Sequence, residues 1–254
     1  SGGGALAGPG SRRGMPVTYR ARPLWAAVPA AGRGSRYGGG RPKQYERLAG
    51  RAVLDWSVSA LLGLDEIAGV AVALADDDAD WATLAVASDP RVYRCRGGRE
   101  RSDSVRAALE ALLAAGASPD DRVLVHDAAR PAVSTAALQR LIQQADPRDG
   151  GLLALPVADT LKRGEAGYST GTVDRSGLWA AQTPQLFPLG ALRTALEAAV
   201  AEGVVPTDEA SAMERTGAHP ALVPGEPGNI KLTRTADREL LAAVLAARQE
   251  GRET

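Results

Sequence analysis

The stretch "LWAAVPAAGRGSRYGGGRPKQY", which runs from Leu24 to Tyr45, joins a short apolar run to a loop rich in glycine and cationic side chains. The apolar run, Leu24–Pro29, has the length and composition of a buried strand. A turn follows it at once, so the loop begins at the carboxyl end of that strand. Open α/β sheets bind their ligands at the carboxyl ends of their strands. The stretch therefore predicts an α/β sheet with a ligand site at this loop.

The rest of the chain repeats this alternation of apolar runs with amphipathic stretches, which is typical of a mainly parallel sheet flanked by helices. Further strands are predicted at Ile67–Leu74, Arg91–Cys95, Arg122–His126, Leu152–Val157, Ala221–Val223 and around Ile230–Leu232. Helices are predicted at Val53–Leu62, Ser102–Ala115, Thr135–Gln144, Leu189–Ala201, Asp208–Arg215 and Ala236–Arg248. The fold class that follows is α/β, with a single mainly parallel twisted sheet in one domain over residues 15–254.

One stretch, Lys162–Trp179, interrupts the alternation. Its segment "TVDRSGLW" offers a turn at Asp174–Gly177 between two short extended runs. We therefore expect a projecting β-hairpin arm over about residues 162–180, too small to have a core of its own. At the start of the chain, residues 1–14 are glycine-rich and contain no apolar segment. They predict a flexible tail, either native or added in cloning.

Charge and cysteine content exclude several classes of protein. The chain carries 30 acidic and 30 basic side chains, so it has no overall positive charge with which to bind nucleic acid or an anionic membrane. No apolar run approaches the roughly 20 residues that cross a bilayer. Cys95 is the single cysteine, which excludes an internal disulfide and suits a reducing compartment. We therefore expect a cytoplasmic protein with no nucleic acid or membrane partner.

The loop after the first strand combines small residues with positive charge. Small residues let backbone N–H groups approach a ligand closely, and positive charges attract an anion. The small residues are Ala30, Ala31, Gly32 and Gly34, and the cations are Arg33, Arg36, Arg41 and Lys43. Their spacing matches neither a Walker A loop nor the G-x-G-x-x-G motif. A bound polyphosphate and a solvated glycine–arginine turn are both compatible with this composition.

Two further segments place a charge beside an apolar strand. In "VHDAARP", residues 125–131, Asp127 directly follows the strand and needs a partner if it is buried. A divalent cation on a triphosphate is one such partner, and the alternatives are capping of the next helix or an ion pair with Arg130. In "NIKLTR", residues 229–234, Lys231 either extends to solvent or points into a cleft.

Two other segments indicate the starts of helices. "RGGRERSDSVRAAL", residues 96–109, places Gly97 and Gly98 after a strand and Ser104 at a helix start. Backbone N–H groups and hydroxyls there can bind an anion or a polar ring edge, although an ordinary N-cap is the simpler interpretation. "PTDEASAME", residues 206–214, is likewise compatible with an N-cap whose acids are favourable at a helix start.

Eight segments, in this order and spacing, resemble the 2-C-methyl-D-erythritol 4-phosphate cytidylyltransferases. They are "PAAGRGSR", "RPKQY", "GGRERSDSV", "VHDAARP", "VADTLKR", "TVDRSGLWAAQTPQ", "TDEASAME" and "NIKLTR", and the likeness extends from about Leu24 to Leu245. The resemblance implies a fold like that of the nucleotide-diphospho-sugar transferases. It also implies transfer of a cytidylyl group from CTP to methylerythritol phosphate in the non-mevalonate isoprenoid pathway, with release of pyrophosphate, a need for Mg²⁺ and a homodimer.

Carried over residue by residue, the resemblance implies a nucleotide site and three catalytic cations. The nucleotide-binding residues are Pro29, Ala30, Ala31, Gly32, Gly34, Gly98, Arg99, Ser104, Asp127 and Ala128. Of these, Gly98, Arg99 and Ser104 lie near the cytosine, and Asp127 faces the metal. The catalytic cations are Arg36, Lys43 and Lys231, which bind the charge that develops on the transferring phosphoryl group.

The resemblance also implies an acceptor site that two subunits share. Its residues are Arg130, Thr160, Arg175, Thr183 and Thr207. Arg175 lies on the predicted arm, which in this family crosses to the partner subunit, so the arms are exchanged within the dimer. The acceptor is a phosphate monoester that is ionised near neutral pH and needs no general base. We therefore expect His126 and His219 to be structural, and fixed positive charge to drive the reaction.

The sequence departs from the family in two places and leaves two alternative functions. Arg99 stands where the family often has an acidic residue, and "YGGGRPK", residues 37–43, is unusually rich in glycine before Lys43. One alternative is a related transferase, such as a ribitol 5-phosphate cytidylyltransferase or another sugar-phosphate nucleotidyltransferase. The other is a non-catalytic module that binds CTP. Arg36, Lys43, Asp127 and Lys231 together argue against the second, because a sensor has no use for transition-state cations.

Overall fold

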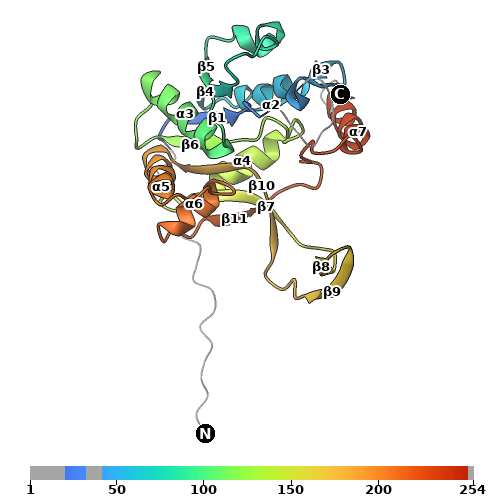
Figure 1. Ribbon diagram of the computed structural model, residues 1–254. Helices are drawn as coiled ribbons and strands as arrows, with labels where there is room; N and C mark the ends of the chain where they lie inside the picture. The colour runs from blue at the N-terminus through green and yellow to red at the C-terminus, as the bar shows by residue number, and fades with distance from the viewer. Residues whose placement is uncertain (1–20, 33–41, 251–254) are drawn as a thin grey trace.

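The computed structural model describes residues 21–32 and 42–250, so the tail predicted for residues 1–14 lies outside the described residues. Its centre is a seven-stranded sheet in the order β11-β7-β10-β6-β1-β4-β5 (Figure 1). The strands are β1 (Leu24–Pro29), β4 (Ile67–Leu74), β5 (Val92–Arg96), β6 (Arg122–Val125), β7 (Gly151–Pro156), β10 (Trp179–Pro188) and β11 (Ala221–Pro224). Neighbouring strands are parallel except where β10 pairs with β6 and β7. The predicted α/β fold with a mainly parallel sheet is confirmed.

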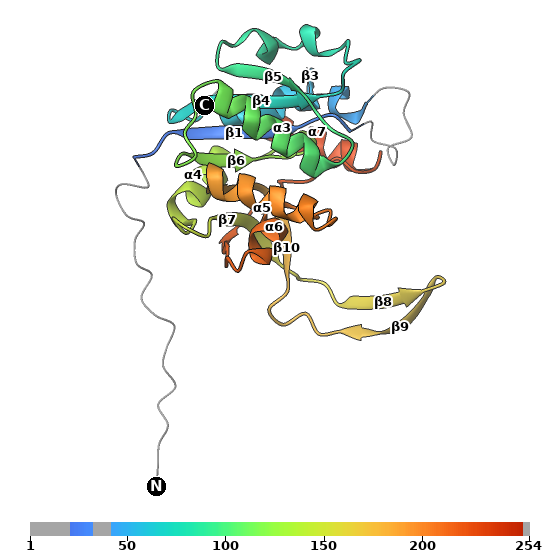
Figure 2. The same ribbon diagram turned by 60° about the vertical axis from the view of Figure 1, so that its left-hand side comes forward.

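Helices cover both faces of the sheet because side chains alternate along each strand. On β1, for example, Ala26 and Val28 belong to one buried cluster, and Trp25 and Ala27 belong to the other. The first cluster includes α2 (Val53–Leu62) and α4 (Thr135–Gln144), and the second includes α3 (Arg101–Ala114), α5 (Leu189–Ala201) and α6 (Glu209–Arg215). Figure 2 shows α3 and α5 side by side on the near face of the sheet. Among the described residues, no helix combines the length and apolar character that a membrane span requires.

The C-terminal helix, α7 (Asp237–Glu250), holds an irregular segment against the body of the protein. Leu241 and Leu245 of this helix pack in a third buried cluster with Leu232. The N–H of Leu232 donates to the carbonyl of Ala129 at 2.8 Å. The strand predicted around Ile230–Leu232 is therefore wrong, because packing and this hydrogen bond hold the segment in place of a strand ladder. Shorter elements are η1 (Lys43–Tyr45), β2 (Arg47–Leu48), β3 (Arg51–Ala52), η2 (Trp81–Thr83) and η3 (Ala85–Ser88).

The sequence does not predict β10, although this strand joins the two parts of the sheet. Its sequence, "WAAQTPQLFP", has Gln182, Thr183 and Gln185 in the middle, which interrupts the apolar pattern. All three side chains are nevertheless buried. The Gln182 amide donates to the carbonyl of Glu226 at 3.0 Å, and the Gln185 amide donates to Asp208 Oδ2 at 2.8 Å. Since distant partners satisfy these polar groups, the segment forms a central strand that the local pattern conceals.

The arm is a separate two-stranded sheet of β8 (Leu161–Glu165) and β9 (Tyr168–Val173), and it projects from the body (Figure 2). Its turn consists of Ala166 and Gly167, which have φ angles of 49° and 87°. The predicted turn at Asp174–Gly177 exists but connects β9 to β10, so the sequence-based position of the hairpin turn is wrong. Alanine rarely adopts a positive φ, which explains why the true turn gives a weak sequence signal.

Candidate active site

A cleft of about 650 Å³ opens beyond the carboxyl ends of β1, β5 and β6. In the sheet order, β1 has β4 on one side and β6 on the other, and ligands of doubly wound sheets bind at such a point. The lining includes every predicted nucleotide-binding residue that the structure describes, which are Pro29, Ala30, Ala31, Gly32, Gly98, Arg99, Ser104, Asp127 and Ala128. Of the predicted catalytic cations, Lys43 and Lys231 also line the cleft. Gly34 and Arg36 lie outside the described residues.

The loops that follow β1 and β5 form one continuous wall of the cleft. The N–H of Ala30 donates to the carbonyl of Ala73 at 2.8 Å, and the Gln44 amide donates to the carbonyl of Ala30 at 2.8 Å. A Cβ atom added at Gly97 would lie only 2.4 Å from the Cβ of Ala31, so the two loops meet where glycine alone fits. Gln44 contributes to this frame although the sequence does not single it out.

The start of α3 forms the side of the cleft nearest to β5. The N–H of Gly98 donates to the Ser104 hydroxyl at 3.2 Å, which folds the loop back onto the first turn of the helix. Glu100 is the N-cap, and its side chain forms a reciprocal capping box with Asp103. Arg99 is exposed at the mouth. This wall offers fixed backbone groups and a hydroxyl, which suit recognition of a polar ring edge.

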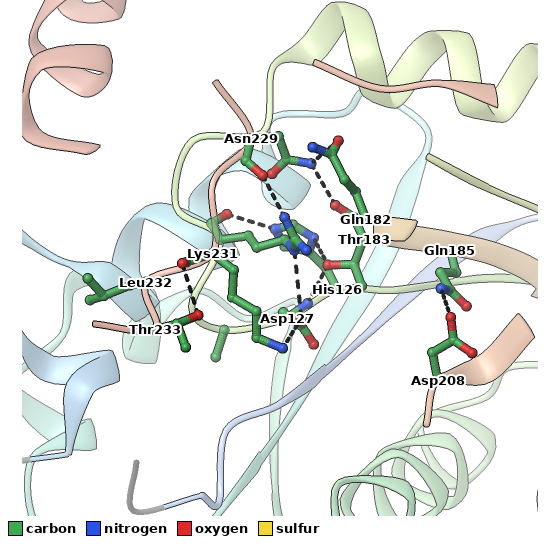
Figure 3. A network of polar contacts seen from close by, with 12 residues as sticks. His126, Asp127, Gln182, Thr183, Gln185, Asp208, Asn229, Lys231, Leu232 and Thr233 are labelled. Atoms are coloured by element: carbon green, nitrogen blue, oxygen red, sulfur yellow. Dashed lines mark hydrogen bonds and ion pairs between the residues drawn. The ribbon is translucent and has the colours of Figure 1, made fainter. Parts of the chain in front are cut away.

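Two lysines bring positive charge to the cleft from different parts of the chain. Lys43 begins η1, and its Nζ donates to the carbonyl of Leu232 at 3.1 Å. Lys231 lies in the irregular segment before α7, with its Nζ 2.8 Å from Asp127 Oδ2 (Figure 3). Its side chain remains 40% exposed. Lys231 therefore points into the cleft, which was one of the two alternatives for it.

Asp127 lies at the floor of the cleft with its side chain 8% exposed. Oδ1 accepts from Arg101 Nε at 2.9 Å, while Oδ2 pairs with Lys231 and lies 3.7 Å from Arg130 Nε. Burial alone would raise the pKa of Asp127, but the charges of Arg101 and Lys231 outweigh it and hold the pKa well below its usual range. Asp127 is thus ionised at neutral pH. It does not cap the next helix, whose N-cap is Ser134, and its pairing with Arg130 is the longest of the three.

The side chains of the cleft fit a metal that arrives with phosphate. Within residues 21–32 and 42–250, no group of three or more His, Cys, Asp or Glu side chains could hold a metal ion. Asp127 is the carboxylate at the floor, and both of its oxygens are already paired with cations. Mg²⁺ is commonly bound through one or two carboxylates together with substrate phosphates. The donor set therefore suits a phosphate-bound cation with a single protein carboxylate.

Arg101 and Glu209 belong to the site although the sequence analysis does not select them. The two terminal nitrogens of Arg101 donate to the Glu209 oxygens at 2.6 and 3.0 Å, and Glu209 is 1% exposed. Burial would lower the pKa of Arg101, but the charges of Glu209 and Asp127 raise it above its usual value. Glu100, Ala129 and Thr233 complete the unpredicted part of the lining, together with Gln44.

The predicted acceptor residues divide into two groups. Thr183 and Arg130 lie behind Asp127: the Thr183 hydroxyl accepts from the N–H of Asp127 at 2.9 Å, and the Arg130 guanidinium donates to the carbonyl of Asn229 at 2.6 Å. Figure 3 shows Thr183 beside His126 and Asp127. Thr160, Arg175 and Thr207 are exposed and do not belong to the cleft lining. A single chain therefore brings together the nucleotide set but not the whole acceptor set.

Neither histidine lines the cleft. His126 is fully buried, its Nε2 lies 3.0 Å from the carbonyl of Arg130, and its Nδ1 lies 3.1 Å from the Thr183 hydroxyl. Burial lowers the pKa of His126 to about 4, so the ring is neutral at pH 7. A neutral ring that donates from Nε2 and accepts at Nδ1 satisfies both contacts. His219, in contrast, is exposed.

We expect this buried ring to make the fold sensitive to mild acid. As pH falls from 7 to 5, the unfolded chain takes up a proton near pH 6.5 while native His126 does not, so the free energy of unfolding falls by roughly 2 kcal/mol. Urea titrations at the two pH values measure this loss. His126→Gln should remove it, and His219→Gln should keep it. Equal pH dependence in the two variants would contradict the assignment, whatever their absolute stabilities.

Relatives of known function match almost the whole chain. The family model described as 2-C-methyl-D-erythritol 4-phosphate cytidylyltransferase matches residues 24–247, which include every segment that lines the cleft. The protein of that name from Halorhodospira halophila is 55% identical over 235 residues, which cover 90% of this chain and 96% of the relative. Its counterpart from Pseudomonas putida strain GB-1 is 52% identical, with 89% of this chain and 97% of the relative covered.

Solved structures agree with these relatives. The crystal structure of a 4-diphosphocytidyl-2C-methyl-D-erythritol synthase superposes with a TM-score of 0.78 at 39% identity, over 88% of this chain and 99% of that one. The Francisella tularensis 2-C-methyl-D-erythritol 4-phosphate cytidylyltransferase gives a TM-score of 0.76 at 32% identity, over 87% and 99%. The similarity therefore extends from the sequence to the arrangement of the whole fold.

Proposed function

Since the chain belongs to the 2-C-methyl-D-erythritol 4-phosphate cytidylyltransferase family, we propose that its cleft binds CTP as the donor of the cytidylyl group. The reaction itself, transfer of that group to methylerythritol phosphate in the non-mevalonate pathway, is the activity of the family and of this chain. One observation carries the proposal: the loop after β1, the start of α3, and the side chains of Lys43 and Lys231 converge on one cleft. A nucleoside triphosphate needs both backbone N–H donors and fixed positive charge.

We assign the two ends of the nucleotide to the two walls of the cleft. Pro29–Gly32 and the lysines lie where the phosphates would bind, because this part combines close backbone approach with positive charge. Gly98 and Ser104 lie where the cytosine would bind, because fixed donors and acceptors can distinguish an exocyclic amine from a carbonyl. Arg99, at the mouth, offers positive charge where the family often has an acidic residue.

We assign Asp127 as the protein ligand of the Mg²⁺ that accompanies CTP. When bound, Mg²⁺ would supply neutralisation of the phosphate charge. The single carboxylate at the floor supports this assignment, since the remaining ligands would be phosphate oxygens and water. Arg101, which stays on Oδ1, keeps the carboxylate ionised and oriented.

The reaction requires the protein to position the two substrates and to supply positive charge to their phosphates. An oxygen of the acceptor phosphate forms a bond to the α-phosphorus of CTP while the bond from that phosphorus to the bridging oxygen breaks, and pyrophosphate leaves with the electron pair. No proton has to move, so His126 and His219 need no part in the step. Lys43 and Lys231, together with Arg36 from the loop, hold the charge that develops on the transferring group and the leaving group.

We propose that the acceptor site is completed by a second subunit in a homodimer with exchanged arms. Thr160 directly precedes β8 and Arg175 follows β9, so both flank the projecting hairpin, and neither lines the cleft of its own chain. Leu178 and Trp179, next to Arg175, are 39% and 37% exposed, and a partner surface would cover them. Arg130 and Thr183 contribute from behind Asp127, and Thr207 lies directly before the N-cap of α6. We place the enzyme in the cytoplasm, because a chain with a single cysteine suits a reducing compartment.

The proposal predicts a clear preference for CTP over other nucleotides. With methylerythritol phosphate as acceptor, kcat/KM for CTP should exceed that for UTP and ATP by roughly 10–10²-fold, since the wrong base leaves buried polar groups unpaired. Pyrophosphate release measures all three rates. Ribitol 5-phosphate serves as the comparison acceptor and should react more slowly. Equal use of the three nucleotides would contradict the assignment of the cytosine site.

A further inference from the structure

Arg101 bridges two carboxylates that come from distant parts of the chain. Its Nε donates to Asp127 Oδ1 at 2.9 Å, and its terminal nitrogens hold both oxygens of Glu209. The side chain of Asp127 is 8% exposed and that of Glu209 is 1% exposed, so both charges are largely removed from water. A planar guanidinium suits this double role, because one fork can bind two acceptors in fixed directions.

Asp127 therefore has two cationic partners of different mobility. Arg101 is fixed by three hydrogen bonds to two acids. Lys231 reaches Oδ2 at 2.8 Å through a flexible stem, and its side chain is 40% exposed on the cleft side. A triphosphate in the cleft would compete with Asp127 for the Lys231 ammonium, whereas Arg101 could not follow without leaving Glu209.

Glu209 keeps Arg101 in place through the start of α6. Glu209 is the first residue of that helix and follows the N-cap Asp208, which also accepts from the Gln185 amide at 2.8 Å (Figure 3). The side-chain Oε1 of Gln185 in turn accepts from the N–H of Ala210 at 2.8 Å. Because β10 and the capping contacts hold α6 at both sides of Glu209, the acid is a rigid anchor for the arginine.

We propose that Arg101 is a positioning residue that allows Lys231 to leave Asp127 and bind the phosphates of the nucleotide. With Arg101 present, the departure of Lys231 leaves Asp127 paired on Oδ1. Without Arg101, the same movement would leave Arg130, whose Nε is 3.7 Å from Oδ2, as the protein counter-charge of the buried carboxylate until the Mg²⁺ assigned to Asp127 binds, which is unfavourable. Lys231 would then remain on Asp127. This inference rests on the proposed binding of a triphosphate in the cleft.

The test is a mutant cycle between the Arg101–Glu209 pair and Lys231. Arg101→Gln alone would leave Glu209 buried and unpaired, so the variant is Arg101→Gln with Glu209→Gln, which removes both charges and keeps the shape of the Glu209 side chain. In the wild-type background, Lys231→Ala should lower kcat/KM for CTP by roughly 10²-fold. In the double variant, Lys231→Ala should lower kcat/KM for CTP by less than about 5-fold, because Lys231 stays on Asp127 there and does not bind the phosphates.

Arg193 offers a matched control, because it also bridges two glutamates, Glu110 at 2.7 Å and Glu197 at 3.1 Å, but on the surface. In an Arg193→Gln background, Lys231→Ala should keep its full effect. If the role of Arg101 were purely structural, the double variant would have a lower melting temperature. Lys231→Ala would then reduce kcat/KM by the same factor in the double variant as in the wild type.

A full 10²-fold cost of Lys231→Ala in the folded double variant would overturn the inference. If the double variant does not fold, Arg101→Met with Glu209→Gln replaces it, since this pair also removes both charges; an undiminished effect of Lys231→Ala there would overturn the inference equally. Wild-type turnover in Lys231→Ala would also overturn it. Failure of the proposed function has a different signature, which is the absence of CTP-dependent pyrophosphate release from the wild-type chain.

Discussion

Replacement of Lys43 by alanine should lower kcat by roughly 10²–10³-fold while the protein remains folded. Lys43 lines the cleft at the start of η1, where its ammonium lies 3.1 Å from the carbonyl of Leu232. A charge that is already positioned there costs no reorganisation when negative charge develops on the phosphates. Because that interaction is stronger in the transition state than in the bound substrate, the loss should appear in kcat and not only in the KM for CTP.

The control is Lys43→Met, which keeps the apolar stem and removes the charge. An equal loss in the two variants assigns the effect to the ammonium, whereas a much smaller loss in Lys43→Met would assign it to packing. Thermal melting checks that both variants fold. Arg36→Ala should give a loss of similar size, since the sequence places this cation in the same loop. A folded Lys43→Ala variant with wild-type kcat would remove Lys43 from the mechanism.

The parts of the site that the sequence predicts are those encoded by adjacent residues. Leu24–Pro29 is a plain apolar run, and the small residues that follow it signal close backbone approach without any knowledge of the rest of the fold. Asp127 is equally local, because a carboxylate directly after an apolar strand stands out. The structure places both at one cleft, since the carboxyl ends of parallel strands share an edge of the sheet.

The parts that the sequence does not predict depend on contacts between distant residues. Arg101 and Glu209 are 108 residues apart. Glu209 has an ordinary local explanation, because an acid is favourable at a helix start, and Arg101 is one of several arginines in the segment "RGGRERSDSV". Nothing in "TDEASAME" indicates that the glutamate is buried. In β10, Gln182 and Gln185 look like breaks in a strand until Glu226 and Asp208 satisfy them. Local patterns cannot predict a polar group whose partner is elsewhere in the fold.

The second large effect is the recovery of activity that we expect if the projecting arm serves the partner subunit. Lys43→Ala and Arg175→Ala chains, each nearly inactive alone, should regain roughly a quarter of wild-type activity per site when they are refolded together. Arg175 lies in the turn between β9 and β10, outside the cleft of its own chain. If it binds the acceptor in the partner's cleft, each active site combines Lys43 of one chain with Arg175 of the other. Exchange in a two-fold dimer is reciprocal, so both sites of the wild type are built in this way.

The size of the recovery follows from the pairing. Random refolding makes roughly half of the dimers mixed, and each mixed dimer has one site with both residues intact and one site with neither, so roughly a quarter of all sites are restored. Each variant refolded alone is the control, as is a mixture combined without unfolding. An arm that serves its own subunit would place one lesion in every site, and the mixture would then stay as inactive as its parts. A partner subunit can cover the exposed Leu178 and Trp179 whether or not the arms are exchanged, so their burial in a dimer would not decide between the two arrangements. The recovered activity does decide, because only exchanged arms can restore an intact site in a mixed dimer.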